Sequence, residues 1–285
     1  MPLWSRRRLA IGGIQVAIDV RPITATLGAE VSGVDMADVD GATMEQLRKA
    51  WLDHKVLVLR NQAVSVEQHI AFGRRFGDLE IHPFATGKKG YPEIVKIKST
   101  ADFQYAANNW HSDVTWRAEP SMGSILRGVI IPPVGGDTCF ADAGAAYQRL
   151  SQEWKDRIES LVAVHDFTQT FGQRLSAEER AEKQAQFPPA RHPVVRTHPE
   201  TGQRTIYTNR SFVREIEGCS AQESAEIVNH LERQIMNPSV QCRIRWDVDT
   251  FVMWDNRAVQ HFATDDFWPE TRQVERVTIV GDAPF

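Results

Sequence analysis

The chain has 285 residues, of which 42% are hydrophobic and 25% are charged, and its formal net charge is -4. A chain of this size and composition can bury a full core, and one large domain built around a sheet accommodates it. The slightly acidic balance argues against a general nucleic-acid or anionic-membrane surface. A membrane span needs a run of about 18 apolar residues, and no such run is found in the sequence.

The cysteines and the first residues indicate the compartment. Cys139, Cys219 and Cys242 have no paired spacing, so we expect neither a disulfide framework nor a zinc knuckle. Their odd number suits a reducing compartment, and we expect a cytoplasmic enzyme. Residues 1–13 hold a basic cluster with no apolar core after it, unlike an export signal. We interpret residues 1–15 as a disordered extension or an early start codon, and residues 16–285 as one domain.

Apolar periodicity predicts the elements in chain order. Met44, Leu47 and Trp51 have helical spacing, which predicts a helix over residues 43–52 with Thr43 as N-cap. A buried strand over 55–59 and a second helix over 65–76, closed by Gly77, should follow. Further strands are expected at 124–131, 137–141, 194–197, 204–207, 242–246, 250–254 and 274–280, with a long amphipathic helix at 221–235.

Many short strands, with two helices ahead of them and one late, are typical of a double-stranded β-helix, or jelly roll. The expected fold class is therefore mainly β, with peripheral helices around a jelly-roll, cupin-like core. Residues 178–187 are charge-dense and poor in apolar side chains, which is usual for a solvated helix or loop. Three histidines on expected helices are predicted to lie at the surface: His54, His69 and His230.

The triplet His111-Ser-Asp113, with His261 far downstream, offers two imidazoles and one carboxylate. That is the ligand set of a non-haem iron(II) oxygenase, which leaves three positions open for a bidentate cosubstrate and O₂. On an extended segment, residues two apart point to the same side, so His111 and Asp113 could hold one metal. The triplet alone is a weak signal, because a chain with 9 histidines and many acidic residues contains one by chance fairly often.

Two arginines after His261 strengthen this interpretation. Arg272 and Arg276 lie four residues apart on an expected strand, so they should share one face. A guanidinium is always charged, and burying it unpaired is costly. Their place beside a cationic metal is explained if two anions, a cosubstrate and a substrate, bind there.

Together these motifs resemble the taurine dioxygenase/phenoxyacetate dioxygenase family of Fe(II)- and 2-oxoglutarate-dependent enzymes, from about Ile18 to Phe285. The segments that carry the resemblance are Leu27–Asp35, Trp110–Thr115, Gly135–Thr138, His192–Pro199 and Trp254–His261, with Arg272 and Arg276. The resemblance implies the jelly-roll fold. It also implies Fe(II) bound by His111, Asp113 and His261, with 2-oxoglutarate and O₂ as the other reactants.

The same resemblance assigns the anion-binding side chains. Arg272 matches the residue that binds the distal carboxylate of 2-oxoglutarate, and Thr138 would add a hydrogen bond. Arg276 matches the cation that meets the substrate anion, and His82 matches a histidine aimed at that anion. Residues 168–191 match a variable insertion that borders the active site, so they are a candidate lid, with plain surface as the alternative.

The substrate end of the pocket differs from that of the taurine enzymes. Ala85 and Ala107 stand where those enzymes carry a Tyr and an Asn that define the amine end. Asn108 and three aromatic residues that match lining positions, Phe167, Phe171 and Phe212, complete the expected pocket. We therefore expect a larger hydrophobic anion, namely an alkyl sulfate, alkylsulfonate or aryloxyalkanoate. Hydroxylation next to its heteroatom would give an unstable adduct that collapses to two products, alongside succinate and CO₂.

Other functions are weighed against this one. A taurine dioxygenase proper, or a biosynthetic hydroxylase or desaturase of the same family, stays open. A cupin-like binding or sugar-metabolising protein has no reason to place Arg272 and Arg276 after the distal histidine. A metal hydrolase would want a base and a zinc ligand set and would not need O₂. The expected partners are a small anionic substrate and further copies of the chain, as a dimer or tetramer, with no nucleic acid or membrane.

Overall fold

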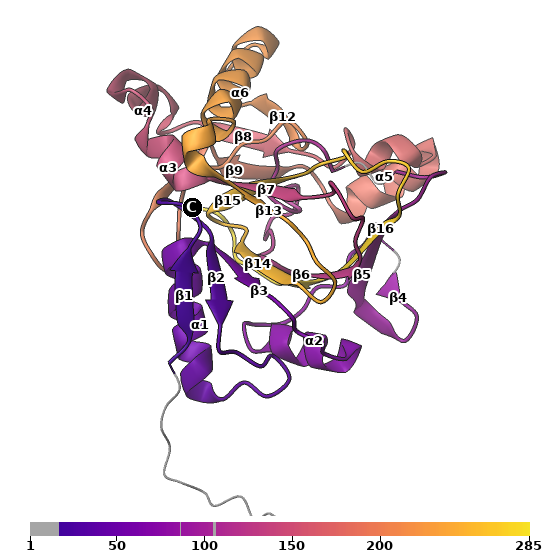
Figure 1. Cartoon of the computed structure of the whole chain (residues 1–285). Coiled ribbons are helices and arrows are strands. Elements are labelled where there is room, and N and C mark those ends of the chain that lie inside the picture. Colours follow the sequence, from indigo (N-terminus) through magenta and orange to yellow (C-terminus); the bar gives the residue numbers. More distant parts are fainter. Residues whose placement is uncertain (1–16, 86, 105–106) are drawn as a thin grey trace, which may run out of the picture.

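A computed structural model describes residues 17–285 except residues 86, 105 and 106, so the extension expected over residues 1–15 lies outside the described residues (Figure 1). The strands are β1 (Asp19–Pro22), β2 (Ala29–Ser32), β3 (Val56–Leu59), β4 (Gly87–Lys88), β5 (Tyr91–Ser99), β6 (Gly123–Ile130), β7 (Thr138–Asp142), β8 (Val162–His165), β9 (Ala190–Pro193), β10 (Val195–Thr197), β11 (Arg204–Ile206), β12 (Val213–Ile216), β13 (Gln241–Ile244), β14 (Phe251–Asp255), β15 (Val259–Ala263) and β16 (Arg272–Ile279). The helices are α1 (Gly41–His54), α2 (Val66–Arg74), α3 (Ala143–Gln148), α4 (Gln152–Ile158), α5 (Ala177–Gln186) and α6 (Ala221–Ile235), with two short 3₁₀ turns, η1 (Phe171–Arg174) and η2 (Pro238–Val240).

The strands form one large sheet and three small ones. The large sheet has the order β1-β2-β3-β14-β6-β16-β5-β4, and the small sheets have the orders β13-β7-β15, β12-β8-β9 and β10-β11. Figure 1 shows β7, β13 and β15 facing the centre of the large sheet, with α1 and α2 on its outer side. Two facing sheets with peripheral helices make a mainly β jelly roll, so the expected fold class is confirmed.

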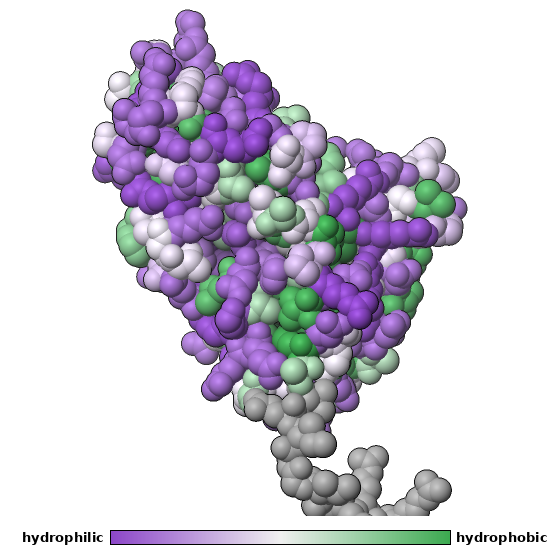
Figure 2. Space-filling view, turned by 60° about the vertical axis from the view of Figure 1, so that its left-hand side comes forward, coloured by the Kyte–Doolittle hydropathy of each residue, from purple (hydrophilic) through white to green (hydrophobic). Residues whose placement is uncertain are grey.

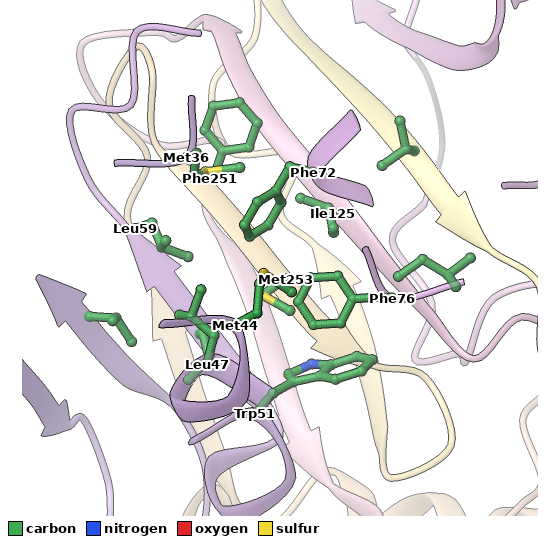
Figure 3. Close-up of a cluster of buried hydrophobic side chains, with 14 of the residues drawn as sticks. Met36, Met44, Leu47, Trp51, Leu59, Phe72, Phe76, Ile125, Phe251 and Met253 are labelled. Atoms are coloured by element: carbon green, nitrogen blue, oxygen red, sulfur yellow. The ribbon is translucent and has the colours of Figure 1, made fainter. Parts of the chain in front are cut away.

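The two faces of β14 explain how the layers are held together. Its five residues are all buried, and their side chains alternate between the two faces of the sheet. Phe251 and Met253 pack on the outer face against α1 and α2 (Figure 3). Val252 and Trp254 pack on the inner face, toward the small sheets. Because both faces are covered, the central strands lie in rigid packing, which is what a precisely spaced set of ligands requires.

The helix ends differ from the expected ones at α1. The N-cap is Asp40 and not Thr43, so the helix begins at Gly41. The side chain of Asp40 accepts a hydrogen bond from the backbone N–H of Thr43 at 2.7 Å. The N-cap of α2 is Ser65, and Gln68 completes a capping box; the helix ends at Arg74, before the expected end at residue 76. The helix at 221–235 has the predicted bounds.

Several elements were not predicted, among them the longest strand, β5, and the helices α3 and α4. Residues 178–187, interpreted as a solvated helix or loop, lie mostly in the exposed helix α5. One predicted surface residue, His69, is buried, with 1% of its surface exposed. It lies on the inner side of α2, where its Nε2 atom is 3.1 Å from the carbonyl oxygen of Ile125. Burial lowers the pKa of His69 to about 3, so the ring is neutral and packs edge-on against Phe251.

Most of the surface in the view of Figure 2 is hydrophilic, and hydrophobic side chains there form small, separate groups. Among the residues that the structure describes, no helix has both the length and the apolar character needed to cross a membrane.

Candidate metal and cosubstrate site

His111, Asp113 and His261 come together inside the jelly roll, and their ligand atoms all lie within 4.8 Å of one another. The two histidines form an isolated antiparallel bridge outside the strand ladders proper. The N–H of His111 donates to the carbonyl of His261 at 3.1 Å, and the N–H of His261 donates to the carbonyl of His111 at 2.8 Å. Asp113 follows in a turn rather than in the extended segment that was expected, yet it still faces both rings.

The two carboxylate oxygens of Asp113 have different neighbours. Its Oδ1 atom lies 3.8 Å from Nε2 of His111 and 3.9 Å from Nε2 of His261. Its Oδ2 atom accepts hydrogen bonds from Arg276 Nη1 at 2.8 Å and from Ser124 Oγ at 3.1 Å. Burial would raise the pKa of Asp113, but the charge of Arg276 and the hydrogen bond from Ser124 oppose burial, and that pKa lies well below its usual range. The group is therefore a carboxylate with one oxygen directed at the imidazoles.

Both imidazoles can present Nε2 as the ligand atom. The Nδ1 atom of His111 lies 2.7 Å from the carbonyl oxygen of Asn109, an acceptor, so Nδ1 carries the proton and Nε2 keeps its lone pair. Burial and the neighbouring His111 lower the pKa of His261 to about 3. A neutral imidazole is the form that binds a metal ion.

The backbone of Asp113 is held by Asn256, a residue that the sequence analysis did not single out. The side chain of Asn256 accepts from the Asp113 N–H at 2.7 Å and donates to the Asp113 carbonyl at 3.0 Å. The next residue, Val114, has a φ of 49°, a conformation that is strained for a β-branched residue. Backbone held in such a conformation by its surroundings is common at functional sites.

Arg272, the first residue of β16, has an unsatisfied edge. Its Nε atom donates to the carbonyl of Gly136 at 2.8 Å, but the buried Nη2 atom has no hydrogen-bond partner among residues 17–285 as described. Burial lowers the pKa of Arg272 to about 10, which leaves the guanidinium charged near neutral pH. A buried cation with an open donor edge fits an anionic ligand, since the unmade hydrogen bond is otherwise costly.

Thr138 lies close to Arg272 through Trp246. The indole N–H of Trp246 donates to Thr138 Oγ1 at 3.0 Å, and the Arg272 guanidinium lies over the Trp246 ring at 5.8 Å. Since its oxygen already accepts from the indole, the hydroxyl hydrogen of Thr138 remains to be donated elsewhere. The two residues predicted to bind the cosubstrate, Arg272 and Thr138, therefore both contact the buried Trp246.

His82 and Glu80 run alongside β16. The N–H of Glu80 donates to the carbonyl of Thr278 at 2.8 Å, and the Glu80 carboxylate pairs with Arg117 at 2.6 Å. Burial and the charge of Arg276 lower the pKa of His82 to about 4. Its Nδ1 atom accepts from the N–H of Phe84 at 3.2 Å, so the neutral ring carries its proton on Nε2 and presents a donor.

An aromatic cluster adjoins the ligand trio. It consists of Val114, Trp116, Phe167 and Phe212, with Phe84, Phe171, Leu175 and Phe187 packed against them. The Phe212 ring lies 6.4 Å from the ring of His111, and the Phe171 ring lies 6.3 Å from that of Phe212. The aromatic residues expected to line the pocket therefore share one cluster next to a proposed metal ligand.

The remaining predicted pocket residues lie at its edge. Ala85 and Ala107 are partly buried, and the Ala107 carbonyl accepts from the N–H of Ala263 at 3.1 Å. Asn108 is exposed, and its amide donates to Asp265 at 3.1 Å rather than to any other predicted site residue. Further site residues were missed by sequence reasoning, namely Glu80, Arg117, Ser124 and Asn256. Their polar side chains carry no spacing pattern that would have revealed them.

Two imidazoles and one carboxylate brought together inside a jelly roll define the class of non-haem iron(II) oxygenases. The neutral rings, the ionised carboxylate and the open edge of Arg272 fit an Fe(II) ion and an anionic cosubstrate.

Comparison with known proteins agrees with this class. Residues 19–278 match the family described as taurine catabolism dioxygenase TauD, TfdA family. An alkylsulfatase of Acinetobacter baylyi is 34% identical, over 93% of this chain and 86% of that protein. An alpha-ketoglutarate-dependent sulfate ester dioxygenase of Pseudomonas putida is 31% identical, over 98% of this chain and 95% of that protein.

Solved structures give the same result. A taurine dioxygenase from Burkholderia xenovorans superposes with a TM-score of 0.82 at 36% identity and covers 94% of this chain and 91% of its own. AAD-2 in complex with Mn(II) and N-oxalylglycine superposes with a TM-score of 0.80 at 26% identity, and the match covers 94% of this chain and 99% of that chain. The chain belongs to the TauD, TfdA family of dioxygenases.

Proposed function

We propose that the chain is an Fe(II)- and 2-oxoglutarate-dependent dioxygenase that hydroxylates a carbon next to the heteroatom of a small hydrophobic organic anion. The products are succinate, CO₂ and the two fragments of the collapsed adduct. The observation that carries this proposal is the trio His111, Asp113 and His261, and the buried Arg272 with its open donor edge supports it. Named relatives act on sulfate esters, sulfonates and phenoxyalkanoates, and these are the substrate classes that we propose here.

The ligand trio would hold the metal through Nε2 of His111, Oδ1 of Asp113 and Nε2 of His261. When bound, Fe(II) supplies O₂ activation coupled to oxidative decarboxylation of 2-oxoglutarate. The protein holds the three ligand atoms in place, and the burial of Asp113 and His261 keeps bulk water away from the reacting groups.

Arg272 and Thr138 would fix the cosubstrate. The open Nη2 edge of Arg272 would donate to the distal carboxylate, and the Thr138 hydroxyl would donate to the same group. A charge-assisted contact of this kind both binds and orients the ligand. N-oxalylglycine, which a solved neighbour binds together with Mn(II), carries two carboxylates at the same ends as 2-oxoglutarate.

The substrate end combines one positive charge with an aromatic wall. Fe(II) with Asp113 and one cosubstrate carboxylate is formally neutral, and Arg272 balances the other carboxylate. Glu80 and Arg117 balance each other, so Arg276 leaves the site with one positive charge for a monoanionic substrate. The neutral His82 adds a hydrogen-bond donor for that anion. The aromatic cluster favours an alkyl or aryl body over the small polar body of taurine.

Succinate release tests the reaction class. The enzyme is supplied with Fe(II), 2-oxoglutarate and one anion at a time: hexyl sulfate, hexanesulfonate, phenoxyacetate or taurine. We expect succinate in air and none under argon, and more with a hydrophobic anion than with taurine. Succinate without O₂, or none with any anion, would refute the proposal. If taurine were preferred, the proposed hydrophobic substrate would be wrong and only the reaction class would stand. An alkene product would indicate the desaturase alternative.

We also infer that the protein is a cytoplasmic homo-oligomer. Val134, exposed at 79%, and Trp268, exposed at 60%, lie on neighbouring segments, since the Gly136 N–H donates to Asp266, and an apolar surface formed there can be covered by another copy. The three cysteines carry no disulfide in the structure, in keeping with a reducing compartment. Light scattering on the purified protein measures its oligomeric state, and a monomer at micromolar concentration would contradict the inference.

A further inference from the structure

The Oδ2 atom of Asp113, the outer oxygen that faces away from the two imidazoles, accepts hydrogen bonds from two donors of different kinds. Arg276 Nη1 reaches Oδ2 at 2.8 Å with a full positive charge, and Ser124 Oγ reaches it at 3.1 Å as a neutral hydroxyl. Ser124 is fully buried, with 0% of its surface exposed. The inner oxygen, Oδ1, is left to face the two imidazoles.

Strand register explains why both donors reach the same atom. β16 pairs with β6 so that Arg276 lies opposite Leu126 and Thr278 lies opposite Ser124. Residues two apart on a strand share a face, so Ser124 and Arg276 lie diagonally on the inner face of the sheet. Both side chains therefore project toward Asp113 from the rigid centre of the large sheet.

A carboxylate can rotate about its Cβ–Cγ bond, and Oδ1 stays aimed at the imidazoles only while Oδ2 is held. Arg276 is the stronger of the two donors, but the proposed function also gives it the substrate anion. An arriving anion draws the guanidinium charge toward itself and weakens its hold on Oδ2. The Ser124 hydroxyl has a single hydrogen and no charge, so it stays on Asp113 whether or not the anion is present.

We propose that Ser124 is a positioning residue that keeps the metal-facing oxygen of Asp113 in place while Arg276 binds the substrate anion. The part that concerns the anion rests on the proposed function. The part that concerns the metal does not, because it rests on the contact between Ser124 and Asp113 alone.

The test measures metal affinity rather than turnover. Mn(II) is titrated into the metal-free protein, and its Kd is compared between wild type and Ser124→Ala. Loss of a contact to a ligating carboxylate weakens metal binding by about 10-fold to 100-fold, and we expect about tenfold here. The matched control is Thr278→Val, which removes the hydroxyl opposite Ser124; that hydroxyl is buried and makes no hydrogen bond within the described part of the chain.

A second titration adds saturating 2-oxoglutarate and hexyl sulfate. In wild type we expect the sulfate ester to leave the Mn(II) Kd within about twofold. In Ser124→Ala the ester should weaken Mn(II) binding by a further severalfold. The hydrogen bond from Ser124 to Oδ2 is then lost, and the ester weakens the one from Arg276. By linkage, Mn(II) should weaken ester binding to the variant by the same factor.

Each result decides one question. Unchanged Mn(II) affinity in Ser124→Ala, with wild type binding tightly, overturns the role of Ser124 and leaves the proposed function intact. An equal loss in Thr278→Val assigns the effect to packing and also overturns it. A sulfate-dependent loss of Mn(II) in wild type as large as in the variant overturns the division between the two donors. A wild type that binds no Mn(II) overturns both this inference and the proposed function.

Discussion

At the scale of single residues, the ligand trio has no substitute close by. Among the described residues, His111, Asp113 and His261 are the one group of three potential ligands whose atoms lie close enough to hold a metal ion. Each side chain supplies one ligand atom, so the loss of any one opens the site further.

Replacing any of these three by alanine should therefore lower turnover by about two orders of magnitude or more, because an open metal site loses affinity with each ligand. Succinate release and Mn(II) titration measure the two effects. His230→Ala, on the outer helix α6, is the control and should behave like wild type. Near-normal succinate release by Asp113→Ala with iron bound would remove Asp113 from the ligand set.

Arg272 offers a separable test of cosubstrate binding. Truncating one partner of a buried, charge-assisted contact costs about 2–5 kcal/mol, so Arg272→Ala should raise the 2-oxoglutarate KM by a factor of about 30 or more. Mn(II) affinity without cosubstrate should change little, and Thr138→Val should have a milder effect of the same kind. An unchanged KM in Arg272→Ala would place the anchor elsewhere, with Arg276 as the next residue to replace.

At the scale of elements, α5 covers the aromatic cluster without burying a residue of its own. Lys183 of this helix lies 5.8 Å from the centre of the Phe84 ring. The residue that follows the helix, Phe187, has its ring 5.2 Å from the ring of Trp116 and 6.1 Å from that of Phe84. The Arg117 guanidinium, which pairs with Glu80, lies 5.9 Å from the Phe187 ring centre. Residues 168–191, expected as a candidate lid or as plain surface, hold η1 and α5, and Phe187 after α5 packs against the aromatic cluster.

Removing that contact should affect large substrates most. Phe187→Ala should raise the KM for hexyl sulfate by about tenfold, a loss of apolar contact within the about 1–3 kcal/mol typical of hydrophobic pockets. The 2-oxoglutarate KM should stay within twofold. Glu182→Ala, on an exposed position of α5, serves as the control. An equal effect on taurine and hexyl sulfate would mean that Phe187 acts on folding and has no part in selectivity.

The sequence predicted those elements whose pattern is local. The helix at 221–235 has clear amphipathic spacing and a capping box, and its bounds were correct. β5 was missed because Pro92 and two lysines interrupt its apolar pattern, although pairing with β16 fixes it. The ligand trio and both arginines could be found by their residue types and spacing. Ser124 and Asn256 could not, because their roles depend on contacts across 11 and 143 residues of sequence.

At the scale of the whole molecule, a buried ionic network links β14 to the hairpin of β10 and β11. Asp255 accepts from Arg257 at 2.8 and 2.7 Å and lies 2.9 Å from Nε2 of His198. Burial would raise the pKa of Asp255, but the hydrogen bonds from Arg257 and His198 outweigh burial and hold that pKa well below its usual range.

This depressed pKa gives stability a definite pH dependence. Because the folded pKa lies below the unfolded value, the carboxylate stabilises the fold above about pH 4. That contribution is lost as the pH falls through the folded value. Asp255→Asn should lower the free energy of unfolding at pH 7 by about 3–5 kcal/mol, the usual cost of breaking a buried pair.

Urea unfolding at pH 7 and at pH 3 measures the difference, which should shrink at the lower pH. Asp247→Asn, an exposed carboxylate, is the control. A difference that is the same at both pH values would assign the loss to packing alone and would contradict an ionic role for Asp255.

The bridge between His111 and His261 makes two amide hydrogens into reporters of the metal. Each amide donates to the other histidine's carbonyl, so neither can exchange with solvent until the two segments separate. An ion held by both rings ties those segments together through their side chains as well. Deuterium uptake at residues 111 and 261 should then slow when Mn(II) is added, whereas uptake at the distant helix α6 stays constant. Occupancy of the site could be followed in this way without any turnover, even before the natural substrate is identified.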